Sequence, residues 1–424
     1  MSRERTPGRR PAGQSASPQP PGATAAKNAT LVGDRATRLA EVQRLKMARS
    51  AHAYVRGSTV KFYAWLEAGP ANVPDGPPVW ICGDCHLGNL GPIADKKGRV
   101  AVQIRDLDQT VIGNPAHDLI RLALSLASAA RSSDLPGVTT ARILEQMVIG
   151  YEAALAGDFD HEGERTMRPR AIRGLLAKSL RRRWRRLAAQ RSDDIGPVVP
   201  LGRRFWPLTG EERQALGALA ATEEIHAIVT KLKSRGEADA VTLVDAAYWM
   251  KGCSSLGRLR YAVMVRVGEG DGASLCLLDI KEAVAAAAPR TPGVDMPRDN
   301  AVRVVTGAKA MSPNLGDRMS AARLLDKAVA VRELLPQDLK LEVSRLTEPK
   351  ALALAAYLAG VVGRAHGRQM TSEIRRAWLK DLTRTRPKAL DAPSWLWSSV
   401  VDLLSVHEAA YLEHCRRFAL AQAA

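Results

Sequence analysis

Two short polar segments bring carboxylates together with a histidine and an asparagine. Residues 83–89 (Gly-Asp-Cys-His-Leu-Gly-Asn) follow the apolar run 78–82, and residues 106–108 (Asp-Leu-Asp) come just after the apolar run 100–104. Each segment therefore begins near the end of a predicted buried strand, where the backbone can hold side chains in defined positions. A carboxylate there can accept the proton of an attacking hydroxyl group, whereas an amide oxygen and further carboxylates can bind a hard cation such as Mg²⁺. The candidate catalytic residues are Asp84 and His86, and the candidate metal ligands are Asn89, Asp106 and Asp108.

Both segments also have simpler interpretations. Aspartate and asparagine beside glycine are common in turns and helix caps, with no role in chemistry. Cys82, Cys85 and His86 match the Cys-x-x-Cys-His pattern of covalent haem attachment, and the cysteine pair alone could contribute to a zinc site. Haem attachment normally takes place in exported proteins, and residues 1–33 lack the apolar run of a secretory signal peptide. We therefore favour the carboxylates over the thiols.

A glycine-rich segment at 251–258 (Lys-Gly-Cys-Ser-Ser-Leu-Gly-Arg) lies between two predicted strands, and Lys281 ends a third. Glycines in a turn allow backbone N–H groups to approach phosphate oxygens, and a lysine on a neighbouring strand can contact the same phosphates as a point charge. No Gly-Lys-Ser/Thr precedes a helix, so the segment is not a P-loop, and a plain β-hairpin is the alternative interpretation. The candidate nucleotide-binding residues are Gly252, Ser254, Ser255, Gly257, Lys281 and Arg56.

The hydrophobic pattern predicts an α+β protein that is mostly helical and has one small antiparallel sheet. The predicted strands cover residues 78–82, 100–104, 246–251, 258–267, 273–281, 320–325 and 327–334. The predicted helices cover residues 34–47, 60–66, 118–131, 139–156 and 348–366, with further helix towards the C-terminus. Asp118 stands at the expected start of one helix, where capping is its simplest role.

The charge of the chain is concentrated in two segments. The 424 residues include 62 lysines and arginines against 44 acidic residues, a formal charge of +18. Residues 1–30 contribute +4 and residues 165–191 contribute +11, so the rest of the chain is close to neutral. We expect 1–33 to be a disordered basic tail and 165–191 to be an amphipathic helix with an arginine-rich face. Nucleic acid is a possible partner for this helix but not the favoured one, because no recognisable binding motif accompanies it and aromatic residues are only 4% of the chain.

Cysteine content and hydropathy bear on the expected location. Five cysteines without a regular spacing do not form the framework of a disulfide-rich secreted domain. No stretch approaches 18 uncharged apolar residues, so neither a membrane span nor a membrane partner is predicted. The expected location is the cytoplasm.

Short blocks spread along the chain match the pattern of one family. They lie at 47–58 (Met47-x-x-Ser50…Tyr54-Val-Arg-Gly-Ser58), 82–89, 106–110, 118–123, 281–283, 303–307 and 365–368. Together they resemble the uncharacterised bacterial family named domain of unknown function 2252, over roughly residues 37–415. The sequence departs from that pattern at Cys85, Leu90, Leu107, Gln109 and Gly367. Only Gln109, where the family usually has an acid, removes a group that could take part in chemistry.

The polar loops are in turn similar to those of aminoglycoside-phosphotransferase-like kinases. This resemblance implies that Asp84 is the catalytic base and that Asn89 and Asp106 bind Mg²⁺, while the glycine turn and Lys281 contact ATP phosphates. In those kinases the glycine turn and the lysine precede the catalytic loop, whereas here they follow it. A circular permutation of a protein-kinase-like two-lobed fold reconciles the order, because permuted chains are viable when the termini lie at the surface. The hypothesis requires Lys281 and Asp106 to lie across one cleft.

This interpretation divides the chain into four parts. They are the tail 1–33, a helical catalytic-loop lobe at 34–240 that includes the basic helix, a small nucleotide lobe at 241–335, and C-terminal helices at 336–424 that complete the large lobe. The predicted function is phosphate transfer from Mg-ATP to an unidentified hydroxyl-bearing small molecule or protein. The alternatives are a nucleic-acid-binding protein that uses residues 165–191 and an inactive pseudokinase that binds nucleotide. No helix glutamate that would pair with Lys281 is evident from the sequence.

Overall fold

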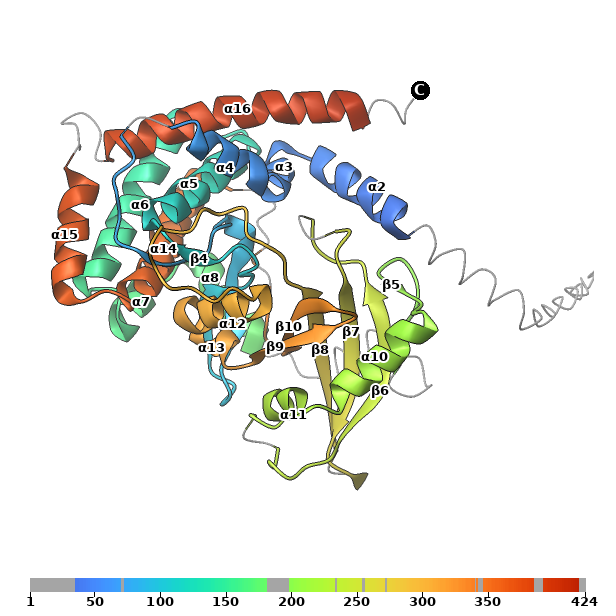
Figure 1. The fold of residues 1–424 in the computed structure, drawn as a ribbon. Helices are drawn as coiled ribbons and strands as arrows, with labels where there is room; N and C mark the ends of the chain where they lie inside the picture. The colour runs from blue at the N-terminus through green and yellow to red at the C-terminus, as the bar shows by residue number, and fades with distance from the viewer. Residues whose placement is uncertain are drawn as a thin grey trace, which may run out of the picture.

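The computed structural model describes residues 35–69, 72–180, 198–232, 235–253, 256–270, 273–339, 341, 346–384 and 392–418. About half of these residues are helical, and the strands form one six-stranded and two two-stranded sheets. Helices surround the small sheets in one part of the molecule, and the large sheet extends from that part with two helices beside it (Figure 1). The predicted α+β class is confirmed, but the prediction of one small antiparallel sheet is wrong, because the strands of residues 79–113 pair among themselves in two further sheets beside the six-stranded one. The tail 1–33, Ser254, Ser255 and residues 181–191 of the expected basic helix lie outside the described residues.

The six-stranded sheet is antiparallel throughout, with the strand order β5-β6-β7-β8-β10-β9. Its strands are β5 (Phe205–Trp206), β6 (Val241–Trp249), β7 (Arg260–Val267), β8 (Ser274–Glu282), β9 (Met319–Leu324) and β10 (Lys327–Leu334). Apolar side chains on one face pack against α10 (Gly210–Ala220) and α11 (Glu223–Val229) in a buried cluster. Leu39 of α2 (Arg35–Ala48) belongs to the same cluster, so this N-terminal helix is also attached to the sheet.

The packing of α10 and α11 bears on the boundary expected at residues 240 and 241. Leu216, Ile225 and Val229 are buried in the same cluster as the strand residues. The apolar side chains of these helices pack on one face of the sheet and exclude water from it. By packing, the sheet unit therefore begins near β5 rather than at residue 241.

The two small sheets bring the polar segments of the sequence together. Strand β1 (Val79–Ile81) pairs with β4 (Val111–Gly113), and β2 (Leu90–Ala94) pairs with β3 (Val100–Ile104), both in antiparallel register. Ile81 lies opposite Val111 and Leu90 lies opposite Ile104. Residues 82–89, which include the 3₁₀ turn η1 (Leu87–Asn89), therefore lie beside residues 105–110.

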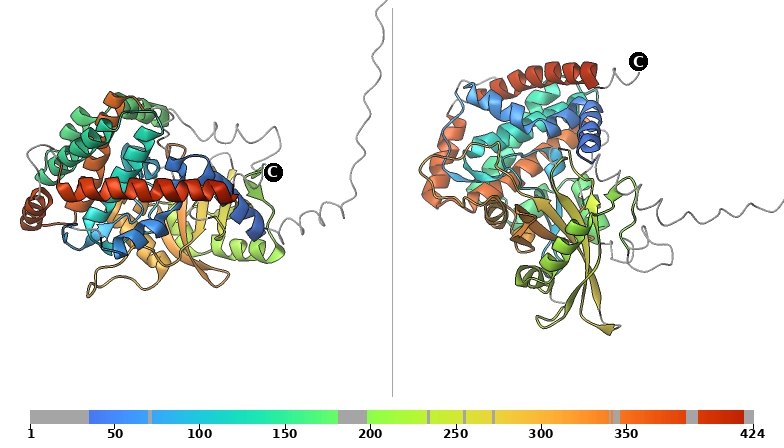
Figure 2. Two further views of the ribbon diagram at one scale, coloured as in Figure 1. Left: turned by 90° about the horizontal axis from the view of Figure 1, so that it is seen from above. Right: turned by 45° about the vertical axis from the view of Figure 1, so that its right-hand side comes forward.

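Helices pack around these small sheets. They are α3 (Ala51–Gly57), α4 (Thr59–Glu67), α5 (Pro115–Arg131), α6 (Val138–Ala156), α7 (His161–Met167), α8 (Arg170–Leu180), α12 (Asn300–Met311), α13 (Pro313–Gly316), α14 (Glu348–Gly367), α15 (Ser372–Thr383) and α16 (Ser394–Phe418). Helix α5 is central and buried along almost its whole length. Helix α16 runs along the outside of this part (Figure 2), and its C-terminal end meets α2, where His414 Nε2 lies 2.8 Å from the backbone oxygen of Arg44. Among the described residues, we find no helix with the length and apolar character that crossing a bilayer would demand.

Candidate active site

A cavity of about 800 Å³ lies between residues 82–110 and the six-stranded sheet. Its walls come from the N-terminal helices α2 and α3, the catalytic-loop segment, the segment after β3, one face of the sheet and residues 334–339. The lining includes most of the predicted site residues, namely Arg56, Asp84, His86, Asn89, Asp106, Asp108 and Gly252. Lys281 contacts two of these aspartates, Asp106 and Asp108. Residues far apart in the sequence thus meet at one cavity.

The backbone of residues 82–89 is held by a buried carboxylate. Asp118 Oδ2 accepts a hydrogen bond from the N–H of Cys82 (2.7 Å), and its Oδ1 accepts one from the N–H of Gly83 (3.0 Å). Gly83 has φ of +73°, and a Cβ there would lie 2.1 Å from the backbone oxygen of Gln109, so a side chain does not fit. The capping role suggested for Asp118 is wrong, because the side chain of Asn114 caps α5 instead.

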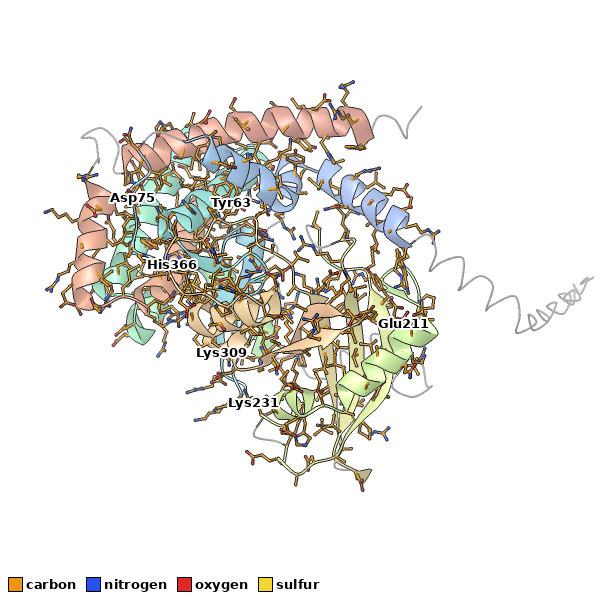
Figure 3. All side chains as sticks on the ribbon, viewed as in Figure 1. Tyr63, Asp75, Glu211, Lys231, Lys309 and His366 are labelled. Carbon is orange, nitrogen blue, oxygen red and sulfur yellow. The ribbon has the colours of Figure 1, made fainter. Side chains whose placement is uncertain are left out.

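A buried histidine in turn supports Asp118. His366 Nε2 of α14 lies 3.2 Å from Asp118 Oδ2, and its Nδ1 lies 2.9 Å from the hydroxyl of Tyr151. The ring is fully buried, and Figure 3 labels His366 among the helices. His366 therefore positions Asp118 and does not line the cavity.

Asp84 projects into the cavity from this supported loop. Its Oδ1 accepts a hydrogen bond from Arg121 Nε at 3.1 Å and forms an ion pair with a terminal nitrogen of the same guanidinium at 3.0 Å. Burial raises the pKa of Asp84, and the charge of Arg121 opposes this rise. His86 Nε2 lies 3.9 Å from Asp84 Oδ2, and burial together with Arg56 and Arg121 lowers the pKa of His86 well below its usual value. The pair therefore offers an oriented carboxylate beside a neutral imidazole, a combination suited to accepting a proton.

Asn89, Asp106 and Asp108 form an oxygen-rich group next to Asp84. Asn89 Nδ2 donates to the backbone oxygens of Asp106 (2.7 Å) and Asp84 (3.3 Å), which leaves the amide oxygen able to bind a cation. Lys281 Nζ lies 3.2 Å from both carboxylate oxygens of Asp106 and also contacts Asp108. The position of Asp106 inside the cavity opposes its ionisation, but Lys281 and Arg260 hold its pKa below the usual value. Burial and the neighbouring Asp106 raise the pKa of Asp108 to about 6.

The sheet face of the cavity carries a charge network that includes two arginines missing from the candidates drawn from the sequence. Asp279 accepts hydrogen bonds from Arg260 (2.8 and 2.6 Å) and Arg332 (3.1 Å), and Lys251 Nζ lies 3.5 Å away. Burial alone would raise the pKa of Asp279, but the three cations hold it well below its usual value. In the strand register, Arg260 lies opposite Lys281 and Arg332 lies opposite Asp279, so all four side chains lie on one face of the sheet. Arg260 and Arg332 could have been found from the sequence, because each is a charged residue within an otherwise apolar strand.

The glycine turn reaches the cavity at one end. Gly252 and Gly257 both have φ of +97°, as the turn interpretation requires. Lys46 Nζ of α2 donates to the backbone oxygen of Gly252 at 2.9 Å, and Gly252 lines the cavity whereas Gly257 does not. Ser254 and Ser255, the other predicted phosphate contacts, lie outside the described residues.

Two other segments noted in the sequence also lie near the cavity. Arg303, the first residue of the block 303–307, donates to the backbone oxygens of Asp108, Thr110 and Val284, so it holds the loop before β4 in place. From the basic segment, α8 buries an apolar stripe and supplies Lys178 to the cavity wall.

The cysteine pair approaches Asp118 closely. The thiols of Cys82 and Cys85 and a carboxylate oxygen of Asp118 lie within 4.8 Å of one another, a spacing compatible with a metal ion. Both carboxylate oxygens of Asp118 already accept backbone N–H groups. Burial raises the pKa of Cys82 well above its usual value and also raises that of Cys85 against the hydrogen bond between the two thiols. Structural zinc is normally held by four cysteine or histidine ligands, and in the described part of the chain this cluster offers two thiols and one carboxylate that is already hydrogen-bonded, so it does not form such a site.

Comparison with known proteins gives a family but no solved relative. No curated protein and no solved structure gives a significant match to the chain. The family model described as "Uncharacterized protein conserved in bacteria (DUF2252)" matches residues 35–417, which include every described part of the cavity wall. The chain therefore belongs to this family of uncharacterised bacterial proteins.

Proposed function

We propose that the protein is a kinase-like phosphotransferase that uses Mg²⁺ and ATP. The observation that carries the proposal is the meeting of Lys281 with Asp106, its Nζ 3.2 Å from both carboxylate oxygens, although 175 residues separate them in the chain. Asp84 and Asn89 line the same cavity. A strand lysine, a metal-binding aspartate, an asparagine and a catalytic aspartate around one cleft are the parts that kinases use.

The order of elements in the sheet unit supports the same proposal. Strand β6, the glycine turn, β7, β8 with Lys281, α12, β9 and β10 follow one another in the order that protein kinases use for their glycine-rich loop, strand lysine and first helix. The catalytic-loop part comes first in this chain, so we propose a circular permutation of that fold. One feature differs: α12 contains no acidic residue, and Asp106 and Asp108 pair with Lys281 instead.

The cavity lining fits the proposed cofactor. Its volume of about 800 Å³ lies in the usual range for small-molecule sites. Asn89, Asp106 and Asp108 offer only oxygen ligands, which Mg²⁺ prefers. Apolar side chains that could cover a nucleotide base also line the cavity, and they are Trp249, Leu277, Leu334, Leu335 and Leu339.

The chain's own residues would divide the chemistry as follows. Bound Mg-ATP supplies an activated phosphoryl group whose negative charge the metal partly neutralises. Asp84 accepts the proton of the acceptor hydroxyl, and Arg121 keeps the carboxylate oriented. Lys281 stabilises charge on the phosphates and keeps Asp106 in place. Asn89 holds the two polar segments together through its amide nitrogen.

The direct test combines calorimetric titration of Mg-ATP with a measurement of ATP turnover. For Asp84→Asn we expect nucleotide affinity within about threefold of wild type and turnover at least about 100-fold lower, because general base catalysis contributes 10²–10⁴-fold. For Asp106→Asn we expect loss of the Mg²⁺-dependent part of nucleotide binding. Asp95→Asn is the matched control, since Asp95 pairs with Arg99 on the β2–β3 turn, away from the cavity.

Three results would count against the proposal in different ways. Absence of binding at millimolar Mg-ATP would reject the nucleotide site. Turnover by Asp84→Asn equal to wild type would reject Asp84 as the base. Tight binding without turnover by the wild-type protein would assign the inactive nucleotide-binding alternative instead.

A further inference from the structure

The cavity wall formed by α2 and α3 is strongly cationic. Lys46 and Arg49 come from the end of α2 and the turn after it, Arg56 comes from α3, and Arg204 lies close to Lys46. In total nine lysines and arginines line the cavity against four aspartates. We infer that this side binds the anionic group of the phosphate acceptor, and that the acceptor is a small hydroxyl compound that already carries a phosphate ester. This inference rests on the proposed function and names the substrate class.

The cations of this wall are not neutralised by the protein. Asp84 pairs with Arg121, Asp106 and Asp108 pair with Lys281, and Asp338 pairs with Arg318. Within the described part of the chain, no salt bridge joins Lys46, Arg49 or Arg56 to a carboxylate. The Nε of Arg56 is buried without a hydrogen-bond partner. A buried donor without a partner is costly, and a bound anion would satisfy it.

The same cations are close enough to repel one another. Burial lowers the pKa of Lys46, and the neighbouring Arg49, Arg204 and Arg56 lower it further. The fold nevertheless holds Lys46 there through its hydrogen bond to Gly252. Like charges gathered in a cleft raise the local concentration of anions.

The wall lies on the acceptor side of the proposed reaction centre. Arg56 lies against Gly88 of the catalytic loop, where an added Cβ would be 3.2 Å from the arginine Nε. Arg121 connects the same helix to the proposed base, because it donates to the backbone oxygen of Val55 and to Asp84. Lys281 and the charge network of the sheet lie on the other wall, where we place the nucleotide phosphates. We therefore assign Arg56 to the acceptor rather than to the nucleotide.

Arginine suits the recognition of a phosphate ester better than that of a neutral sugar. Its planar fork of N–H donors matches phosphate oxygens, and at pH 7 the ester carries almost two negative charges. The cavity must hold both reactants in about 800 Å³, which favours a small metabolite over a macromolecule. A polycationic acceptor would be repelled by the same wall.

Calorimetry on protein saturated with Mg²⁺ and a non-hydrolysable ATP analogue tests the inference. Inorganic phosphate is the probe, because the analogue blocks the nucleotide site. We expect saturable binding with a millimolar or lower dissociation constant, and at least tenfold weaker binding to the double variant Arg49→Gln/Arg56→Gln. The matched control is Arg376→Gln, which removes one charge from the exposed face of α15 and should leave binding unchanged.

The analogue and the folded state serve as internal checks. The double variant should bind the analogue as wild type does, and its melting temperature should stay equal or rise because repulsion is relieved. Failure of wild type to bind the analogue would overturn the proposed function. Normal analogue binding with no phosphate binding, or with equal phosphate binding by the double variant, would overturn this inference alone.

Discussion

Replacement of Asp118 by asparagine probes the connection between the helical core and the catalytic loop. Asp118 is fully buried and accepts the N–H groups of Cys82 and Gly83 at 2.7 and 3.0 Å, one on each carboxylate oxygen. Asparagine can accept only one of these bonds and turns an N–H₂ group towards the other donor. A hydrogen bond to a charged group contributes about 1.5–3 kcal/mol, and the abandoned N–H adds a desolvation cost. We therefore expect Asp118→Asn to lower the free energy of unfolding by about 3 kcal/mol.

Two measurements separate local from global effects. Urea unfolding followed by tryptophan fluorescence gives the free energy of unfolding, and hydrogen exchange of the peptide that contains residues 82–89 reports the loop directly. Asn114→Ala is the matched control, because it removes the actual cap of the same helix and should cost about 1 kcal/mol. The control should leave exchange at Cys82 and Gly83 unchanged.

The pattern across the two variants decides the role of Asp118. If Asp118→Asn costs no more than Asn114→Ala and the loop amides remain protected, then Asp118 does not hold the loop. The account of how Asp84 is positioned would then fail with it. Equal loss of protection in both variants would instead point to α5 as a whole.

Three further outcomes follow from buried groups. Burial lowers the pKa of His407 to about 4 from its ordinary value of 6.5, so this group stabilises the folded state above pH 6.5. About 3 kcal/mol of that stabilisation is lost as the pH falls to 4. Urea unfolding of His407→Leu should therefore depend less steeply on pH, and an unchanged slope would refute the assignment. Gly83→Ala should destabilise by several kcal/mol or abolish ATP turnover, whereas Gly98→Ala, at φ of +77° with open space around it, should cost only about 1 kcal/mol. Asp279→Ala should lower the free energy of unfolding by about 3–5 kcal/mol, because three cations lose their shared partner. A change below about 1 kcal/mol would show that water already solvates these cations.

The predicted elements agree with the observed ones where a single periodic pattern decides the structure. Strand 100–104 matches β3, and the predicted helix 348–366 falls one residue short of α14. Agreement was weaker at β6, predicted from 246 and observed from 241, because its first residues are only partly buried and carry a weaker alternation. The assignment of α10 and α11 depends on which apolar surface they cover, and that information lies in tertiary packing rather than in local periodicity.

The polar loops could be predicted because they follow apolar strands, but their supports could not. Asp84, Asn89 and Asp106 stand in short segments rich in glycine and acid, a local signal. The support of Asp84 by Arg121, and of the loop backbone by Asp118, is made across 35 to 37 residues and requires the observed strand pairing. Lys281 with Asp108 is a still longer connection, and the two aspartates stand where the sequence offered no helix glutamate for the lysine.

Charge shows most clearly what a linear reading leaves out. Summed along the chain, everything outside 1–30 and 165–191 is nearly neutral, yet the cavity wall has five more basic than acidic residues. Most of these cations come from outside the two basic segments, because folding brings residues of α2, α3 and the sheet to one cavity. The sheet cations share Asp279, whereas Lys46, Arg49 and Arg56 form no salt bridge within the described part of the chain. In the proposed reaction this excess of positive charge would reduce the repulsion between two anionic reactants. Mg-ATP and a phosphate ester each bring roughly two negative charges at neutral pH, and their approach within one cavity requires about four positive charges to offset the repulsion. The excess of five basic residues over the whole lining is of that size, so the cations of both walls together offset the charge of the two proposed reactants.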